Sequence, residues 1–346
     1  MDNVFNFNEF EENAQKENIN YWVNDLRSTV ELNSIIETPA FKRLYDISFL
    51  GAIDYSERNE LLKIDRNRAV HSLNVAGIAN FVATTRNYNP ELKRHIIAAA
   101  LLHDIGHIPL SHSAEPYIQE KFGYGHHEIG ENLISGSAWK DSGLTNVLSK
   151  SFDIEFITSL LNGSVTSEGA DIFNNKINAD TIDGILRCIE YKGINQICYL
   201  NRISIAKAAF FDSDKHCNNK RINILDEFWK TKHFVYHNFI NNMHGVLSDK
   251  LSQVFFNETR SVKYKDLISE EDNWKGKYKT LFSWLTALKT KKIPHCLKDY
   301  DLHYTTRKYE IISSEKCITK RYINKKKKAI ISQNCLMSYQ EVDFKQ

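Results

Sequence analysis

The residues best suited to chemistry lie together in one stretch, residues 101–112, which reads LLHDIGHIPLSH. Five of the 13 histidines of the chain fall between His103 and His127, a density that calls for a functional explanation. Adjacent His103 and Asp104 can hold one metal ion from two directions. An imidazole and a carboxylate together suit Mn, Fe, Ni or Zn, and Mg less well. The stretch therefore predicts part of a site for a divalent metal ion.

Two ligands do not complete a metal site, and two further residues are candidates to complete it. His71 lies on the predicted inward face of an upstream helix, and Asp180 opens the downstream run Asp180-Thr181-Ile182-Asp183. Four protein ligands would leave room for a water molecule or a phosphate oxygen on a six-coordinate metal. Asp180 could instead be an ordinary helix N-cap, and Asp183 could then be the ligand.

Helices are expected to position these ligands, because apolar residues recur at spacings of three and four. Gly106 is expected to end the second of three such helices, and Asp180, Asp183 and Arg187 lie on a neighbouring face of the third. The three stripes comprise His71, Val75, Ile78 and Val82; Leu92, Ile96, Ala99 and His103; and Ile182, Ile185 and Ile189.

Helical patterns dominate to about residue 255, and the character of the chain changes after about residue 290. Thr38-Pro39 is typical of a helix start, since proline fits the first helical turn, and residues 225–256 read as long helices. Residues 308–312 and 317–323 read as short strands bounded by polar turns. We expect a mainly α protein, with a helical domain over residues 1–255 and a basic, helical and partly stranded extension over residues 256–346.

Charge is balanced overall, with 45 Lys+Arg against 43 Asp+Glu, so composition gives no global attraction to nucleic acid or membrane. The charge is uneven along the chain: residues 1–40 hold eight acids and two bases, whereas residues 286–346 hold fourteen bases and six acids. The basic segment includes Lys325-Lys326-Lys327-Lys328. This run could be a solvated basic turn or a patch that attracts nucleic acid or phosphate.

The chain carries no sign of export or membrane insertion. Its first residues are polar and acidic, unlike a signal peptide, and the longest wholly apolar run, residues 96–102, is far shorter than the ~20 residues that span a bilayer. The six cysteines form no CxxC pair, so neither a zinc knuckle nor a redox motif is indicated. We expect a cytoplasmic protein with reduced thiols and no membrane partner.

The ordered set of motifs resembles the HD superfamily of metal-dependent phosphohydrolases. Arg68-Ala69-Val70-His71, then His103-Asp104, then Asp180 match its H…HD…D pattern. Residues 36–44, 103–112 and 126–128 look like the deoxynucleoside triphosphate triphosphohydrolase branch, and the resemblance covers about residues 25–250. It implies an HD-domain helical fold, a nucleotide substrate, a homo-oligomer, and a divalent metal (Mn, Fe, Mg, Zn or Ni) held by His71, His103, Asp104 and Asp180.

The resemblance also implies which residues contact phosphate. Arg68 would do so through its planar fork, and His107 and His112 would reach the phosphates from the loop after the HD pair. His112 could instead simply tie down a turn. Lys232 stands where the family has a phosphate-binding arginine.

The same resemblance assigns the acid or nucleophile at the scissile phosphate to His127. A histidine can serve there because its ordinary pKa lies near neutrality. Glu115 would orient His127, although it could also be a plain first-turn helix acid. His126 is expected at the surface.

The sequence departs from the branch where the family reads the sugar. Phe49, which precedes Leu50, stands where the branch usually has Gln, and Thr181, Gly184 and Cys188 stand where it has Lys, Tyr and Asp. Phe, Gly and Cys cannot make the same hydrogen bonds to a deoxyribose. With Phe49, Leu50 and Gly184 at the substrate, we predict relaxed nucleotide selectivity or a changed substrate, unless the local alignment is off by a residue or two.

Three functions remain open from the sequence. The first is metal-dependent hydrolysis of a (d)NTP to nucleoside and tripolyphosphate, with altered sugar selectivity. The second is a phosphodiesterase or nuclease acting on cyclic nucleotides or single-stranded nucleic-acid ends, which the basic C-terminal segment favours. The third is a non-catalytic module that binds nucleotide or nucleic acid, which the complete ligand set opposes.

Overall fold

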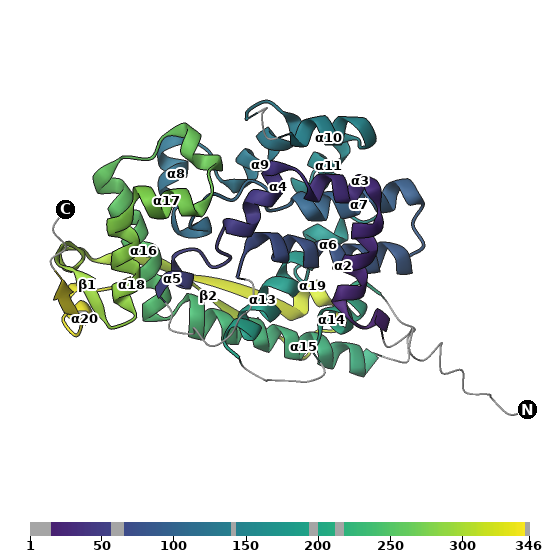
Figure 1. Ribbon diagram of the computed structural model, residues 1–346. Helices are drawn as coiled ribbons and strands as arrows, with labels where there is room; N and C mark the ends of the chain where they lie inside the picture. Colours follow the sequence, from purple (N-terminus) through teal and green to yellow (C-terminus); the bar gives the residue numbers. More distant parts are fainter. Residues whose placement is uncertain (1–14, 57–65, 140–142, 194–199, 212–217, 343–346) are drawn as a thin grey trace, which may run out of the picture.

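The computed structural model describes residues 15–56, 66–139, 143–193, 200–211 and 218–342. These residues form a mainly helical body with a short β-ribbon near the C-terminus (Figure 1), which confirms the expected fold class. The elements before residue 140 are α2 (Ile19–Ser28), α3 (Val30–Ile36), α4 (Pro39–Lys42), η1 (Arg43–Asp46), α5 (Ala52–Ser56), α6 (Arg68–Thr85), α7 (Pro90–Leu102), η2 (Ser111–Ser113), α8 (Glu115–Phe122) and α9 (His126–Ser135).

The later elements include the long helices expected over residues 225–256. The helices and turns are α10 (Leu144–Ser151), α11 (Ile154–Leu161), α12 (Asp171–Asn174), α13 (Ala179–Tyr191), α14 (Arg202–Phe210), α15 (Asn218–Val235), the π-helical turn η4 (Tyr236–Ile240), α16 (Met243–Thr259), η5 (Tyr264–Ile268), α17 (Glu271–Lys277), α18 (Lys279–Leu288), η6 (His295–Asp299), α19 (Ile318–Arg321) and α20 (Gln333–Leu336). The strands are β1 (Lys292–Pro294), β2 (Leu302–Ile311), β3 (Tyr322–Ile331) and β4 (Gln340–Val342).

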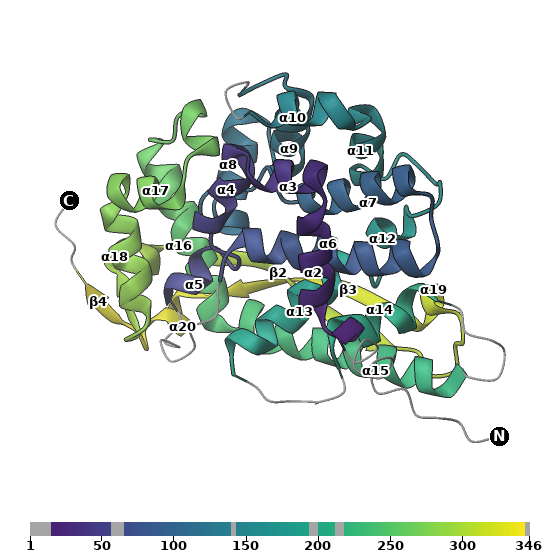
Figure 2. The same cartoon turned by 45° about the vertical axis from the view of Figure 1, so that its right-hand side comes forward.

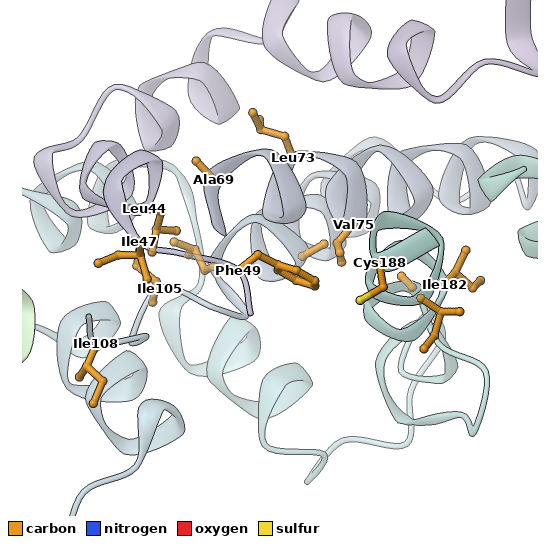
Figure 3. Close-up of a cluster of buried hydrophobic side chains, with 14 of the residues drawn as sticks. Leu44, Ile47, Phe49, Ala69, Leu73, Val75, Ile105, Ile108, Ile182 and Cys188 are labelled. Atoms are coloured by element: carbon orange, nitrogen blue, oxygen red, sulfur yellow. The ribbon is translucent and has the colours of Figure 1, made fainter. Parts of the chain in front are cut away.

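Helix α6 lies at the centre of the helical body (Figure 2). It is buried along most of its length, because α2, α7, α13 and α14 pack around it. Apolar side chains from separate segments meet beside it: Leu44 and Ile47 approach Ile105, and the ring of Phe49 extends between α6 and α13 (Figure 3). The centre of the core therefore lies directly behind the predicted ligand His71.

Local sequence signals begin the helices that carry the ligands. Asn67 caps α6 and Asn178 caps α13, each accepting a hydrogen bond from the backbone N–H three residues on. Thr38 and Pro39 begin α4 in the same way, as predicted. Because Asn178 is the cap of α13, Asp180 is the second residue of that helix, and the interpretation of Asp180 as an N-cap is wrong.

Helix α7 ends at Leu102, before the predicted end at Gly106, and His103 is its C-cap. Gly106 is needed for another reason. A Cβ atom at this position would lie 2.0 Å from the carbonyl oxygen of His126 and 2.3 Å from the backbone nitrogen of Gly130. The start of α9 therefore passes directly against the loop that follows the HD pair.

Strands β2 and β3 form an antiparallel ribbon that packs against α15 (Figure 1). The strand predicted over residues 308–312 lies at the end of β2. The strand predicted over residues 317–323 is wrong for most of its length, since residues 318–321 form α19. The four lysines 325–328 lie inside β3 and not in a turn, because each is paired with a residue of β2.

The hydrophobic core is continuous across residue 255. Helix α16 runs through that position, and Phe256 packs its ring against Trp274 and Tyr278. A division of the chain at residue 255 stays a prediction. Among the described helices, none combines the length and the apolar composition needed to cross a bilayer.

Candidate functional site

The four predicted metal ligands converge from the ends of three helices. The Nε2 atom of His71 lies 3.2 Å from Nε2 of His103 and 3.1 Å from Oδ1 of Asp180. The carboxylate of Asp104 lies 3.6 Å from Nε2 of His71 and 3.5 Å from Nε2 of His103. Atoms that share a metal ion at about 2.0–2.2 Å lie roughly 3 Å or a little more apart. The donor set and its spacing therefore fit one divalent ion.

The second ring nitrogen of each histidine is already engaged. Nδ1 of His71 lies 2.6 Å from Oδ2 of Asp183, and Nδ1 of His103 lies 2.8 Å from the carbonyl oxygen of Ala100. Partners of this kind fix the ring so that the other nitrogen faces a metal ion. Both Nε2 atoms are therefore oriented toward the position that the ion would occupy.

The two acids of α13, Asp180 and Asp183, approach different nitrogens of the His71 ring. Asp180 approaches Nε2 of His71, whereas Asp183 approaches Nδ1 of the same ring and is fully buried. Arg187 and Arg202 hold Asp183 through ion pairs at 2.8 and 2.5 Å. Burial alone would raise the pKa of Asp183, but the charges of these two arginines outweigh it and lower the pKa well below its usual range. Asp183 supports a ligand and stays ionised, and Asp180 is placed to be one.

Arg68 is buried and holds Asp104 in place. Its Nη1 donates to Asp104 at 2.7 Å, its Nη2 to the carbonyl oxygen of Phe49 at 2.7 Å, and its Nε to the hydroxyl of Ser111 at 3.2 Å. Burial opposes ionisation of Asp104, but nearby positive charge, Arg68 included, lowers the pKa of that carboxyl well below its usual range. Arg68 is thus a positioning residue, and its contact with a phosphate stays a prediction.

A second group of imidazoles borders the metal position. The rings of His107 and His126 stack with centroids 4.2 Å apart, and His112 lies 5.2 Å from His126. Glu115 joins two of them, since its Oε1 lies 2.5 Å from Nδ1 of His126 and its Oε2 lies 2.9 Å from Nδ1 of His112. Burial opposes ionisation of Glu115, but these contacts lower its pKa below the usual range. The Nε2 atoms of both histidines remain for the cavity that both residues line.

The structure corrects the expected pairing of Glu115 with His127. Glu115 contacts His126, whose side chain is 14% exposed, while the side chain of His127 is exposed at the rim of the same cavity. Successive helical residues are turned by about 100°, so only one of the two can face inward. The close approach at Gly106 fixes the start of α9 and selects His126, and the expected surface position of His126 is wrong.

His107 is almost fully buried within this cluster. Its Nε2 lies 3.3 Å from Oδ1 of Asp104, but among the described residues neither ring nitrogen has a hydrogen-bond partner. Burial lowers the pKa of His107 well below its usual range, and the nearby charge of Arg68 adds to the effect. His107 is therefore neutral near pH 7, and both of its ring nitrogens are buried without a hydrogen-bond partner among the described residues.

A buried glutamate that the motifs do not reveal supports the loop carrying these histidines. Leu110 and Ser111 adopt left-handed backbone angles, with φ of 62° and 45°, which non-glycine residues rarely adopt. Glu271 accepts hydrogen bonds from the backbone N–H groups of Leu110 and Ser48, from the Ser48 hydroxyl, and from the hydroxyl of Tyr55. Only the fold could reveal this contact, since Glu271 comes from α17.

The predicted substrate residues border one apolar cavity of about 220 Å³ beside the metal position. A larger neighbouring cavity of about 700 Å³ is lined by His103, Asp104, Asp180 and the histidine cluster. A Cβ at Gly184 would lie 3.6 Å from the ring of Phe49, which is an ordinary van der Waals contact, so a small side chain would fit at this position. The predicted substrate residues among those that line the smaller cavity are Phe49, Leu50, Arg68, His112, Gly184 and Lys232.

Lys232 supplies a buried cation to both cavities. Its Nζ lies 5.0 Å from the ring centre of Trp229 and 4.9 Å from that of Tyr309. Burial lowers the pKa of Lys232 to about 8, while the charge of Asp180 partly opposes this change. The lysine is therefore mainly protonated at pH 7 and is sensitive to pH just above it.

Comparison with known proteins finds a match to one protein family in the region that carries the site. Residues 68–152 match the HD domain family, and this region contains His71, His103 and Asp104. A solved structure of a hypothetical protein from Aquifex aeolicus has the same fold, with a TM-score of 0.63 and 15% identity over 88% of this chain and 93% of that one. The predicted resemblance to the HD superfamily is confirmed.

Curated relatives point to the same branch at modest identity. The chain is 28% identical over 184 residues to a deoxynucleoside triphosphate triphosphohydrolase SAMHD1 homolog of Dictyostelium discoideum, covering 49% of this chain and 35% of that protein. It is 40% identical over 87 residues to a deoxyguanosinetriphosphate triphosphohydrolase-like protein of Rickettsia typhi, covering 25% and 20%. The chain thus spans about a third or less of the length of these two relatives.

Proposed function

We propose that this HD-domain chain is a metal-dependent phosphohydrolase that splits a nucleoside triphosphate into nucleoside and tripolyphosphate. The observation that carries the proposal is the convergence of His71, His103, Asp104 and Asp180, each with its supporting contacts, beside a cavity lined by imidazoles and a lysine. The names of the curated relatives support a nucleotide substrate.

A divalent metal bound by the four ligands would polarise a phosphoryl oxygen and lower the pKa of a bound water. The chain itself supplies the remaining groups. Lys232, which lines the cavity, binds phosphate oxygens. His126, whose Nδ1 is held by Glu115, gives a proton from Nε2 to the 5′-oxygen of the leaving nucleoside, because the carboxylate partner fixes the orientation of the ring.

Three of the residues that stand where the branch reads the sugar offer no strong hydrogen-bonding group in this chain. Phe49, Gly184 and Cys188 border the smaller cavity and cannot donate strong hydrogen bonds to a sugar hydroxyl. A site discriminates strongly against a missing hydroxyl only when it holds a buried polar partner for that hydroxyl. The enzyme is therefore expected to hydrolyse ribo- and deoxyribonucleotides with kcat/KM values within roughly tenfold of each other.

Incubation of the metal-loaded protein with single dNTPs and NTPs, with products resolved by mass, tests the proposal. Nucleoside and tripolyphosphate together support it. Nucleoside monophosphate with pyrophosphate would show that another bond is cut. A protein that can be loaded with metal but turns over none of the nucleotides would contradict catalysis and favour a binding module.

A further inference from the structure

The lysine run of β3 is divided between two faces of the β2–β3 ribbon. Side chains of a strand alternate between faces, and the register pairs Thr305 with Lys328 and Arg307 with Lys326. Thr305, Arg307 and Lys328 line a cavity of about 670 Å³ next to the active-site cavity. Lys326 lies on the same face, directly opposite Arg307. We call Thr305, Arg307, Lys326 and Lys328 the cavity face of the ribbon.

The opposite face carries lysines whose charge is partly compensated. Lys308 and Lys325 form ion pairs with Glu310 at 2.9 and 2.5 Å. In the part of the chain that the structure describes, no carboxylate pairs with Lys326, Lys328 or Arg307, and the guanidinium of Arg307 lies 5.8 Å from the ring centre of Tyr236. The cavity face of the ribbon therefore carries positive charge that no carboxylate of the described residues compensates.

The cavity face continues a line of cations that begins at the metal position. Lys232 lines the active-site cavity together with Asp180 and Arg307. Arg307 and Thr305 border the active-site cavity and the ribbon cavity alike, together with His112, Ile240 and Asn241. The two cavities are thus joined, with positive side chains from Lys232 out to Lys328.

A row of this length exceeds what one nucleotide needs. Same-face residues on a strand are about 7 Å apart, and a cavity of about 700 Å³ already has the size of a complete small-ligand site. Proteins that bind single strands combine a positive groove with aromatic groups on which bases stack, and His303 and Tyr304 line the ribbon cavity.

We propose that the cavity face of the ribbon binds the phosphates of a single-stranded nucleic acid whose terminal nucleotide enters the metal cavity. This proposal goes beyond the hydrolysis of free nucleotides. It rests on the proposed function only for the placement of the terminal nucleotide in the metal cavity. Binding along the ribbon needs no turnover.

Matched double variants of the full-length protein test the proposal. Lys326→Gln/Lys328→Gln removes two charges from the cavity face, and Lys325→Gln/Lys327→Gln removes two from the other face of the same strand. Binding of fluorescein-labelled oligothymidylate and oligouridylate of about 12 nucleotides is measured by anisotropy over a salt series. We expect the first pair to weaken binding at least tenfold and to reduce the slope of log K against log salt by about 1.4. The second pair should change the affinity less than about twofold.

The same variants are assayed for hydrolysis of a free dNTP and for thermal unfolding. Weakened strand binding with an unchanged Tm in the first pair supports the proposal, even if the wild-type protein turns over no nucleotide. Where the wild-type protein does hydrolyse a dNTP, the KM for that dNTP should be unchanged in the first pair. An equal loss of oligonucleotide affinity in both pairs of variants would show non-specific charge attraction and would overturn the proposal. So would absence of strand binding, or a raised dNTP KM in the first pair with intact strand binding, which would assign the cavity face to the triphosphate.

Discussion

At the scale of single residues, the two ring nitrogens of His71 have different partners. Asp180 is placed at Nε2 and Asp183 at Nδ1, and only the first faces the metal position. Asp183→Asn should therefore weaken metal affinity by roughly 10–100-fold without abolishing binding, because the ring loses its charged support but keeps its ligand nitrogen. Calorimetric titration of the metal-free variant with Mn²⁺ measures this. Wild-type affinity in Asp183→Asn would show that the contact has no role in metal binding.

The neighbouring histidines of α9 provide their own matched control. His126→Ala should lower kcat by roughly 10²–10⁴-fold while the metal content stays unchanged, because we propose the residue held by Glu115 as the proton donor. His127→Ala removes an adjacent, exposed imidazole and should retain most of the rate. The reverse pattern, with His127 essential and His126 dispensable, would show that α9 is turned the other way in the working enzyme.

Lys232 predicts a pH effect just above neutrality. With a pKa lowered to about 8, its ammonium group loses its proton as the pH rises from 7 to 9, so the KM for a nucleotide should rise across this range. Lys232→Arg should keep a low KM at pH 9, since arginine stays charged. Lys232→Met should show a high KM at both pH 7 and pH 9. A KM that rises equally with pH in Lys232→Arg would assign the effect to another group.

At the scale of elements, the helix faces and the residues that meet at the metal position were predictable, but the contacts between distant elements were not. His71, His103 and Asp180 follow from helical spacing and motif order, because both are local properties of the sequence. The choice between His126 and His127 depends on the close approach at Gly106, which is a tertiary contact. The strand that holds the lysine run is likewise defined by its pairing with β2.

Glu271 is the element-scale contact whose removal is most informative. Glu271→Ala leaves buried N–H groups of Ser48 and Leu110 without an acceptor, which should cost about 1–3 kcal/mol of folding stability and lower kcat by displacing the loop of His112. Glu271→Gln keeps an oxygen for these donors and should behave like the wild type. Thermal unfolding and steady-state kinetics of both variants provide the measurement. An equal loss of stability and kcat in Glu271→Ala and Glu271→Gln would mean that the charge of Glu271 matters and not the geometry of its acceptor oxygens.

At the scale of the whole molecule, the extension after residue 255 is part of the body that builds the site. It supplies Glu271 to the active-site loop, Arg307 to the cavity, and Tyr278 and Trp284 to the ring of Phe255. A fragment of residues 1–255 should therefore fail to unfold cooperatively in calorimetry, since it exposes these apolar contacts. A sharp transition near that of the full chain would instead support two independent domains. The homo-oligomer and the cytoplasmic location stay predictions.

The most direct test of metal-dependent nucleotide hydrolysis is a titration of the metal-free protein with Mn²⁺, in which bound metal and dNTP turnover are measured on the same samples. We predict no turnover without metal and a rate that rises in proportion to bound ion up to one per chain, with His103→Ala inactive and metal-poor. Turnover by the metal-free protein, or full occupancy of the site without hydrolysis of any nucleotide, would contradict this function.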